Sequence, residues 1–183
     1  MGGMDLDAWL PSPEIVTRHH RHAAADPDAL WDAARSVRLD QTRTIGRLVR
    51  WRIPGVPRDQ SFMGLLAHDP FTVLDEGPRH SISGLCGRIW TLQRDYAQLD
   101  GPEDFAAWDA PRTVRVLFAH WVAPASDGRS TLHSEARVAP TDPIATLRLR
   151  ALWLAVGPFE RLIGAEALAL AAARAEAGAA RRG

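Results

Sequence analysis

The 183-residue chain has a single cysteine and contains neither lysine nor asparagine. Because Cys86 stands alone, an intrachain disulfide is excluded, and with it the disulfide framework of many small secreted domains. All 22 basic residues are arginine, and alanine, glycine and proline are plentiful, as the codons of a GC-rich bacterial genome would produce. We therefore expect a protein of the reducing bacterial cytoplasm.

Long apolar runs are also missing. No stretch of 18 apolar residues occurs that could span a bilayer, and the N-terminus starts acidic, unlike a signal peptide. The 22 basic and 22 acidic residues cancel, and no stretch gathers arginines and aromatics into a stripe that could follow a phosphate backbone. These absences argue against a membrane span and against a nucleic-acid partner.

Several catalytic motifs are absent as well: a glycine-rich phosphate loop, a dinucleotide-binding fingerprint and a Gly-x-Ser-x-Gly elbow. Kinases, nicotinamide-dependent oxidoreductases and serine hydrolases are therefore set aside, and we expect no cofactor. His20 and His22 share one face of a strand, but without a Cys pair or an HExxH motif we expect an exposed polar strand and no metal site. Cys86 lies inside a strand pattern, which is typical of a small buried residue.

The composition, with 46% apolar and 24% charged residues, is that of one soluble globular domain. We expect residues 1–14 to be a loose lead-in, residues 15–178 to form the domain, and residues 179–183 to be a disordered tail. No internal repeat occurs, and the Pro/Gly clusters are turn-sized.

Hydrophobic periodicity and turn residues predict one strand, two helices, and then a run of antiparallel strands. Asp26-Pro27 is typical of a helix N-cap followed by its first residue. The expected strands are 15–24, 71–75, 80–92, 112–122 and 130–138, and the expected helices before the last one are 27–37, 45–53 and 102–108.

A long C-terminal helix is predicted after Thr141-Asp142-Pro143. Proline within this helix, at Gly157-Pro158, predicts a kink. The helix has an apolar ladder spaced three or four residues apart, which we expect to be buried against the concave face of the sheet. Its members are Leu149, Trp153, Val156, Phe159, Ile163, Ala167 and Leu170.

This α+β order resembles the helix-grip fold, a curved antiparallel sheet wrapped around a long C-terminal helix, with two smaller helices after the first strand. The fold belongs to the SRPBCC superfamily of START lipid-transfer domains, birch-pollen-allergen-like proteins and polyketide aromatase/cyclases. The local sequence also resembles an actinobacterial branch of that superfamily, in Gly84–Trp90, Glu135–Val138, Thr141-Asp142 and Trp153–Phe159. The resemblance covers about residues 15–176 and implies a fold and a cavity for an apolar ligand. Two departures are the strand count, five where seven are usual, and the long second helix.

His120 is the one candidate catalytic residue. In the strand 112–122, one face carries Val114, Val116, Phe118, His120 and Val122, and this largely apolar face should point inward. An inward imidazole could act as an acid or base. The alternative is a core histidine whose ring is satisfied by a neighbouring group.

Small inward residues around Ser134 leave space for a ligand, since this strand places Leu132, Ser134 and Ala136 on one face. Glu135 and Arg137 fall on the opposite face and are expected to be a structural ion pair. The expected cavity residues are Arg88, Trp90, Phe118, Ser134, Trp153, Val156, Phe159 and Ile163.

The sequence predicts binding of a hydrophobic small molecule, a lipid, polyketide or other secondary metabolite, by a carrier or sequestering protein that is a monomer or homodimer. The alternative is a cofactor-independent acid–base enzyme of the aromatase/cyclase type that uses His120. A third possibility is a filled core, with function residing in a surface partner. Few inward titratable groups favour binding over catalysis, because an enzyme needs an acid and a base with separated pKa values.

Overall fold

A computed structural model describes residues 4–52, 55–91, 93–125 and 128–181, apart from the side chains of Arg52 and of residues 158–164. Its five antiparallel strands form one sheet in the order β1-β5-β4-β3-β2. The strands are β1 Ile15–Ala23, β2 Thr72–Gly77, β3 His80–Gly87, β4 Val114–Pro124 and β5 Ser130–Pro140. The helices are α1 Pro27–Arg35, η1 Leu39–Gln41 (a 3-10 turn), α2 Ile45–Arg52, α3 Phe62–Leu65, α4 Pro102–Ala107 and α5 Pro143–Ala180.

Helices α1 and α5 both begin with the predicted Asp-Pro pair, in which the aspartate is the N-cap. The Asp26 carboxylate accepts the backbone N–H of Asp28 at 2.8 Å and starts α1. The Asp142 carboxylate accepts the N–H of Ala145 at 2.7 Å and starts α5. Each cap satisfies a donor that has no partner within its helix, and the proline that follows has no N–H to lose.

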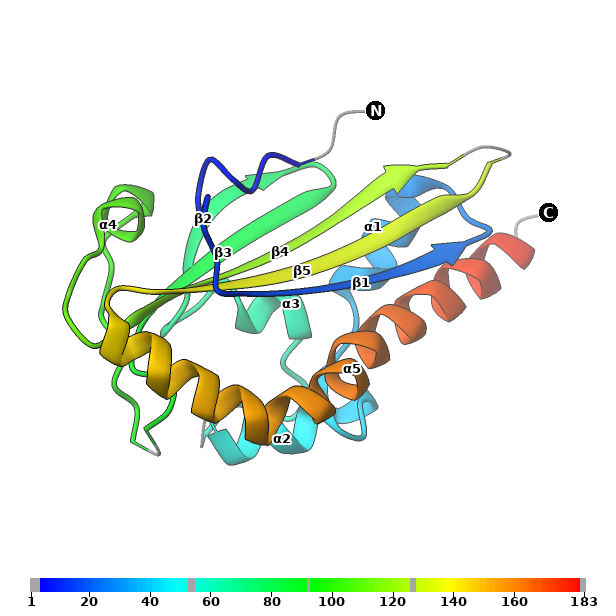
Figure 1. Ribbon diagram of the computed structural model, residues 1–183. Helices are drawn as coiled ribbons and strands as arrows, with labels where there is room; N and C mark the ends of the chain where they lie inside the picture. Colours follow the sequence, from blue (N-terminus) through cyan, green and yellow to red (C-terminus); the bar gives the residue numbers. More distant parts are fainter. Residues whose placement is uncertain (1–3, 53–54, 92, 126–127, 182–183) are drawn as a thin grey trace.

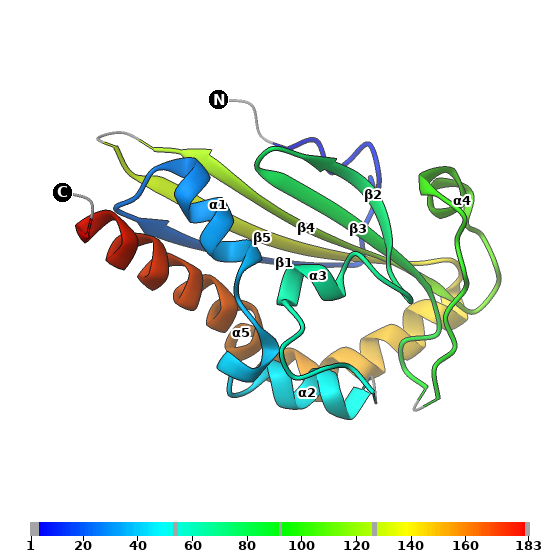
Figure 2. The same cartoon turned by 180° about the vertical axis from the view of Figure 1, so that it is seen from behind.

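The chain has the predicted α+β, helix-grip architecture. The curved sheet wraps around α5, which crosses beneath its concave face and bends in the middle, where Gly157-Pro158 stands (Figures 1 and 2). Helices α1, α2 and α3 lie on the same side of the sheet as α5. These four helices therefore lie against one face of the sheet.

The concave face has a packed cluster at each end. Near the C-terminal end of α5, Val122 and Leu132 pack with Leu30 and Trp31 of α1 and with alanines of α5. These alanines, which let the helix approach closely, are Ala167, Ala171, Ala172 and Ala175. At the other end, Leu149 of α5 packs with Val114, Val116 and Val138. The part of the concave face between these two clusters contains the candidate ligand site.

The convex face is covered by residues that we expected to be loose. Leu6 and Leu10 of the N-terminal segment are fully buried against Leu117 and Ala119 of β4, and Phe105 of α4 joins the same cluster. The lead-in expectation was therefore wrong. The physical reason is that both faces of β4 carry apolar side chains, so the convex face also needs a cover.

β3 is shorter than predicted. It ends at Gly87, not at Leu92, because Gly87 has a φ of 147° and the chain at Asp95 and Tyr96 crosses directly against it. A Cβ at Gly87 would lie 2.2 Å from the Asp95 carbonyl oxygen, so no side chain fits there. The strand alternation predicted through residue 92 therefore does not apply beyond Gly87.

Candidate ligand site on the concave face

His120 lies on the concave face of β4, 3% exposed, as the strand alternation predicted. Its Nε2 is 3.1 Å from the hydroxyl oxygen of Ser134, its cross-strand neighbour on β5. Phe62 of α3 packs edge-on against the imidazole, with ring centroids 5.6 Å apart. Burial lowers the pKa of His120 to about 4, so the ring is neutral at pH 7.

The middle of the concave face is less covered than its ends. Thr17, Phe118, Ser134 and Ala136 are only half-buried, although they lie in the same sheet face as the two packed clusters. We call these four residues the central patch. Since residues of the same face are fully buried on either side of it, the gap in coverage is local.

Helix α5 shows why the central patch is open. Residues 145, 149, 152 and 156 fall on one side of an α-helix, since they are spaced three or four apart. Ala145 and Leu149 are fully buried, Leu152 is half-buried, and Val156 is 41% exposed. The expectation that Val156 is buried was therefore wrong: the helix departs from the sheet toward its middle, where it bends (Figure 1).

Aromatic side chains border the central patch. Phe118 contacts Phe71 edge-to-face with centroids 5.8 Å apart. Trp90, in the segment after β3, packs with the Leu149 cluster and has the Arg148 guanidinium 5.9 Å from its ring. Trp153 is half-buried on α5. Phe159 and Ile163, the other expected cavity residues, have side chains outside the described residues.

Two buried donors have no partner. In the part of the chain that the structure describes, the buried side-chain polar atoms without a hydrogen bond are Nη1 of Arg50 and Nε1 of Trp90. Arg50 is half-buried and directly follows Val49, which packs on the core together with Phe62. A buried donor left unpaired is costly. Both groups are donors, so what they lack is an acceptor.

Sequence reasoning missed Arg50. The spacing of Ile45, Leu48 and Val49 predicted an amphipathic helix. An arginine directly after the apolar Val49 was the only sequence signal that a charged side chain could be partly buried there. In the structure the inner face of α2 is formed by Ile45 and Val49, whereas Leu48 is exposed. The inner face is thus rotated from the expected one, and this rotation brings Arg50 inward.

Arg88 and Cys86 do not join the central patch. The Arg88 guanidinium pairs with Asp95 at 2.5 Å and is partly exposed. Cys86 belongs to the cluster on the convex face, opposite Arg115 in the register. Burial raises the pKa of the Cys86 thiol to about 12, so it remains protonated and is not a nucleophile at neutral pH.

The convex face carries the other polar residues that the sequence singled out. Glu135 and Arg137 form the expected ion pair at 2.6 Å, and Arg18 pairs with the same carboxylate at 2.9 Å. Asp7 of the N-terminal segment also pairs with Arg137.

Three histidines lie nearby on the convex face. His20 and His22 of β1 are exposed, and His133 of β5 stacks on Trp121 with centroids 4.8 Å apart. Burial, and then the proximity of His20 and His22, lowers the pKa of His133. Among the described residues, no three His, Cys, Asp or Glu side chains are arranged to hold a metal ion.

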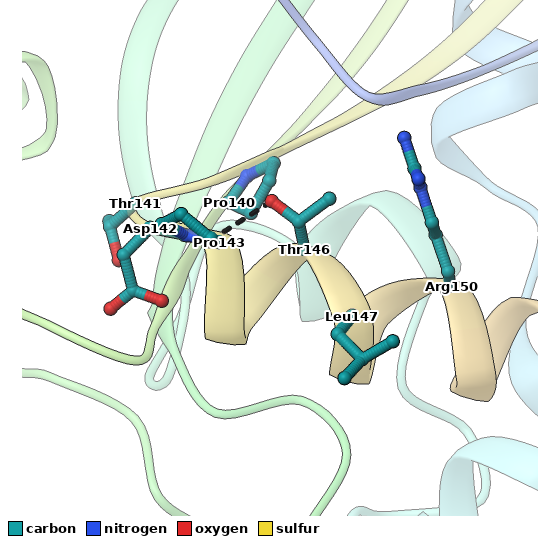
Figure 3. Close-up of a pocket in the computed structure, with 7 residues that line it drawn as sticks. All are labelled: Pro140, Thr141, Asp142, Pro143, Thr146, Leu147 and Arg150. Carbon is teal, nitrogen blue, oxygen red and sulfur yellow. Dashed lines mark hydrogen bonds between the residues drawn. The ribbon is translucent and has the colours of Figure 1, made fainter.

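A surface hollow of about 560 Å³ lies at the junction of β5 and α5 (Figure 3). It begins at Pro140, six residues along β5 from Ser134, the cross-strand neighbour of His120. It is lined by Pro140, Thr141, Asp142, Pro143, Thr146, Leu147 and Arg150. Its acidic group, the Asp142 carboxylate, is already engaged by the backbone N–H groups of Ala145 and Arg112. The hollow is wide open and its polar groups are used in capping, so we do not assign it as the site.

Known proteins resemble the chain in structure only. No protein-family model and no curated protein matches it in sequence. A protein from Thermus thermophilus is similar in structure at 13% identity, with a TM-score of 0.35, covering 90% of this chain and 99% of that one. A hypothetical protein from Helicobacter pylori has 11% identity and a TM-score of 0.42, covering 96% and 99%. The ZhuI aromatase/cyclase from Streptomyces sp. R1128 has 13% identity and a TM-score of 0.33, covering 88% and 93%.

Proposed function

We propose that the protein binds a hydrophobic small molecule, such as a lipid, a polyketide or another secondary metabolite, over the central patch, and acts as its carrier or sequestering protein. The observation that carries this proposal is the exposure of Val156 on the sheet-facing side of α5, opposite a half-buried patch of the sheet. Apolar surface that is held open between two packed clusters is what an apolar ligand needs. Membership in the SRPBCC superfamily and its actinobacterial branch, and a cytoplasmic location, belong to the same proposal.

The unpaired donors specify one end of the ligand. Arg50 Nη1 and Trp90 Nε1 both lack an acceptor. Trp90 packs with the Leu149 cluster, and Arg50 follows Val49, which packs with the other cluster. A ligand with a carbonyl, carboxyl or phosphate oxygen would supply one after a small side-chain movement. The ligand that fits is therefore an apolar body with an acceptor at its end.

The state of His120 favours binding over catalysis. A general base works best when its pKa lies near the working pH. With a pKa of about 4, His120 is a weak base at pH 7, and the hydroxyl of Ser134 already occupies its Nε2. The aromatase/cyclase alternative would require the ligand to raise that pKa and displace Ser134. We therefore assign His120 a packing and hydrogen-bonding role beside the patch.

A substitution that fills the space tests the proposal. Val156→Trp enlarges the side chain on the side of α5 that carries Ala145 and Leu149, and Leu154→Trp, two residues away and 83% exposed on the outer side, is the matched control. We expect an apolar fluorescent dye to bind the wild type and the control saturably and to bind Val156→Trp at least tenfold more weakly. Native mass spectrometry of the purified wild type should show a co-purified small molecule that the Val156→Trp variant lacks.

Equal dye affinity in both variants would place binding elsewhere on the molecule, and absence of saturable binding to the wild type would leave the filled-core alternative. Turnover of an identified ligand that is lost in His120→Phe would favour the enzyme instead. These outcomes are separable because the first two concern affinity and the third concerns rate.

A further inference from the structure

The outer sides of α2 and of the first half of α5 expose large apolar side chains. On α2, Trp51 is 66% exposed and Leu48 is 41% exposed. On α5, Ile144, Leu147 and Leu154 are exposed in the same way, with Leu147 at 70%. The α5 positions are spaced three and seven apart and so form one stripe. Several large apolar side chains exposed on neighbouring helices are typical of an interaction surface.

The two helices lie side by side. The Glu166 carboxylate of α5 accepts the backbone N–H groups of Thr44 at 3.0 Å and Ile45 at 3.2 Å, and so caps the start of α2 on α5. Both views show α2 against the middle of α5, on the side of the molecule away from the sheet (Figures 1 and 2). We call Trp51, Leu48, Arg47, Leu147 and Leu154 the basic apolar surface.

The segments that contain α2 and the first half of α5 carry a net positive charge, unlike the whole chain. Residues 41–58 contain five arginines and no acidic residue, and of these arginines Arg43, Arg47 and Arg58 are exposed. Residues 143–159 contain Arg148 and Arg150 and no acidic residue. The full chain, by contrast, has equal numbers of basic and acidic residues. Of the acids that touch these helices, Glu166 caps α2, Asp142 caps α5, and Glu14 pairs with Arg150 at 2.6 Å.

We propose that the basic apolar surface docks on the anionic surface of a lipid bilayer. An exposed tryptophan beside arginines suits the bilayer interface, where the indole lies at headgroup level and the guanidinium groups meet lipid phosphates. Docking here is peripheral, since no helix in the described part of the chain is long and apolar enough to cross a membrane. The inference stands apart from the ligand proposal, because it rests on the outer side of these helices.

Charge argues against the two other occupants. A second copy of the chain, meeting this surface about a two-fold axis, would bring Arg47 and its neighbours against the same arginines of its partner. A nucleic acid needs a longer basic track than one two-turn helix offers. A flat layer of anionic headgroups satisfies the arginines and the apolar side chains together.

Vesicle flotation tests the proposal with the full-length protein. The probes are phosphatidylcholine vesicles with and without 30% phosphatidylglycerol. We expect the wild type to float with the anionic vesicles only, and less at 0.5 M salt. Arg47→Glu, which changes two unit charges at an exposed position, should weaken partitioning about 30-fold, and Trp51→Ser about 10-fold.

Arg129→Glu is the matched control, because Arg129 is exposed and the β4–β5 hairpin that carries it lies at the opposite end of the sheet from the first half of α5 (Figure 1). Circular dichroism should show that all three variants are folded. No flotation of the wild type, or equal loss in Arg129→Glu, would overturn the proposal. So would a concentration-dependent dimer that Trp51→Ser abolishes in the absence of vesicle binding, or binding to free RNA but not to vesicles.

Discussion

On the convex face of the sheet, residues 4–14 and α4 cover a cluster centred on β3 and β4 and leave the outward side chains of β1 exposed, whereas the concave face is covered at its two ends and left partly open between them. On the convex face, Leu6 and Leu10 reach 2% and 0% exposure. On the concave face, Phe118 and Ser134 remain half-buried although their neighbours along the strands are buried. The chain thus covers the middle of the convex face and the two ends of the concave face.

The buried polar groups of the two faces differ in the same sense. On the convex face, the Glu135 carboxylate is shared by Arg18 and Arg137, and Arg137 is also paired with Asp7. Near the concave face, His120 is kept neutral, and the Arg50 and Trp90 donors lack acceptors. Groups that the chain completes by itself are structural. Groups that it leaves incomplete are those available to a ligand.

The largest expected effect comes from comparing one apolar truncation on each face. Leu10→Ala should lower the free energy of unfolding by about 3 kcal/mol, since it leaves a cavity in a closed cluster. Phe118→Ala removes a larger side chain but should cost about half as much, because that side chain is only half-buried. Urea denaturation of both variants measures the difference. A greater loss in Phe118→Ala would mean that the central patch is packed.

The next effect is on the pH dependence of stability. Because the pKa of His120 is about 4 in the fold and about 6.5 in the unfolded chain, the unfolded state binds the extra proton first as the pH falls. The contribution of a neutral His120 to the free energy of unfolding is therefore fully present above pH 6.5. As the pH falls from 6.5 to 4, the free energy of unfolding decreases by about 3 kcal/mol. His120→Phe should flatten this part of the curve, measured by urea denaturation at each pH. An unchanged curve would show that His120 protonates without cost in the fold.

Local signals of the sequence predicted much of this fold. Asp26-Pro27 and Asp142-Pro143 fixed two helix starts because a cap needs only neighbouring residues. The alternation Val114, Val116, Phe118 predicted the concave position of His120 because a strand has a period of two.

Non-local features could not be predicted in this way. Nothing near Leu6 or Leu10 indicates that the convex side of β4, more than 100 residues away, needs a cover. Equally, the position of Val156 in the α5 ladder predicts which side of the helix it occupies, but not how far the helix stands from the sheet. Arg50 was missed for a similar reason, since the inner side of a two-turn helix depends on how it docks.

On the convex face, Glu135→Gln should cost about 2 kcal/mol. It keeps the shape of the side chain but removes the charge between two arginines, of which Arg137 is nearly buried. Asp7→Asn is the control on the same network and should cost under about 1 kcal/mol, because Asp7 is exposed. Thermal unfolding near pH 7 compares the two. Equal losses would contradict the view that Glu135 is the centre of the network.

The smallest effect concerns the hydrogen bond between Ser134 and His120. Ser134→Ala should cost about 1 kcal/mol, because Nε2 of a buried ring loses its 3.1 Å partner. This loss of unfolding free energy can be assigned to the Ser134–His120 hydrogen bond only if it disappears when the imidazole is absent. The measurement is therefore a double-mutant cycle. In the His120→Phe background, Ser134→Ala should be close to neutral, since Phe118 and Ala136 already make this stretch of the face apolar. If Ser134→Ala cost the same in both backgrounds, the hydroxyl would be serving another group, and the neutrality of His120 would rest on burial alone.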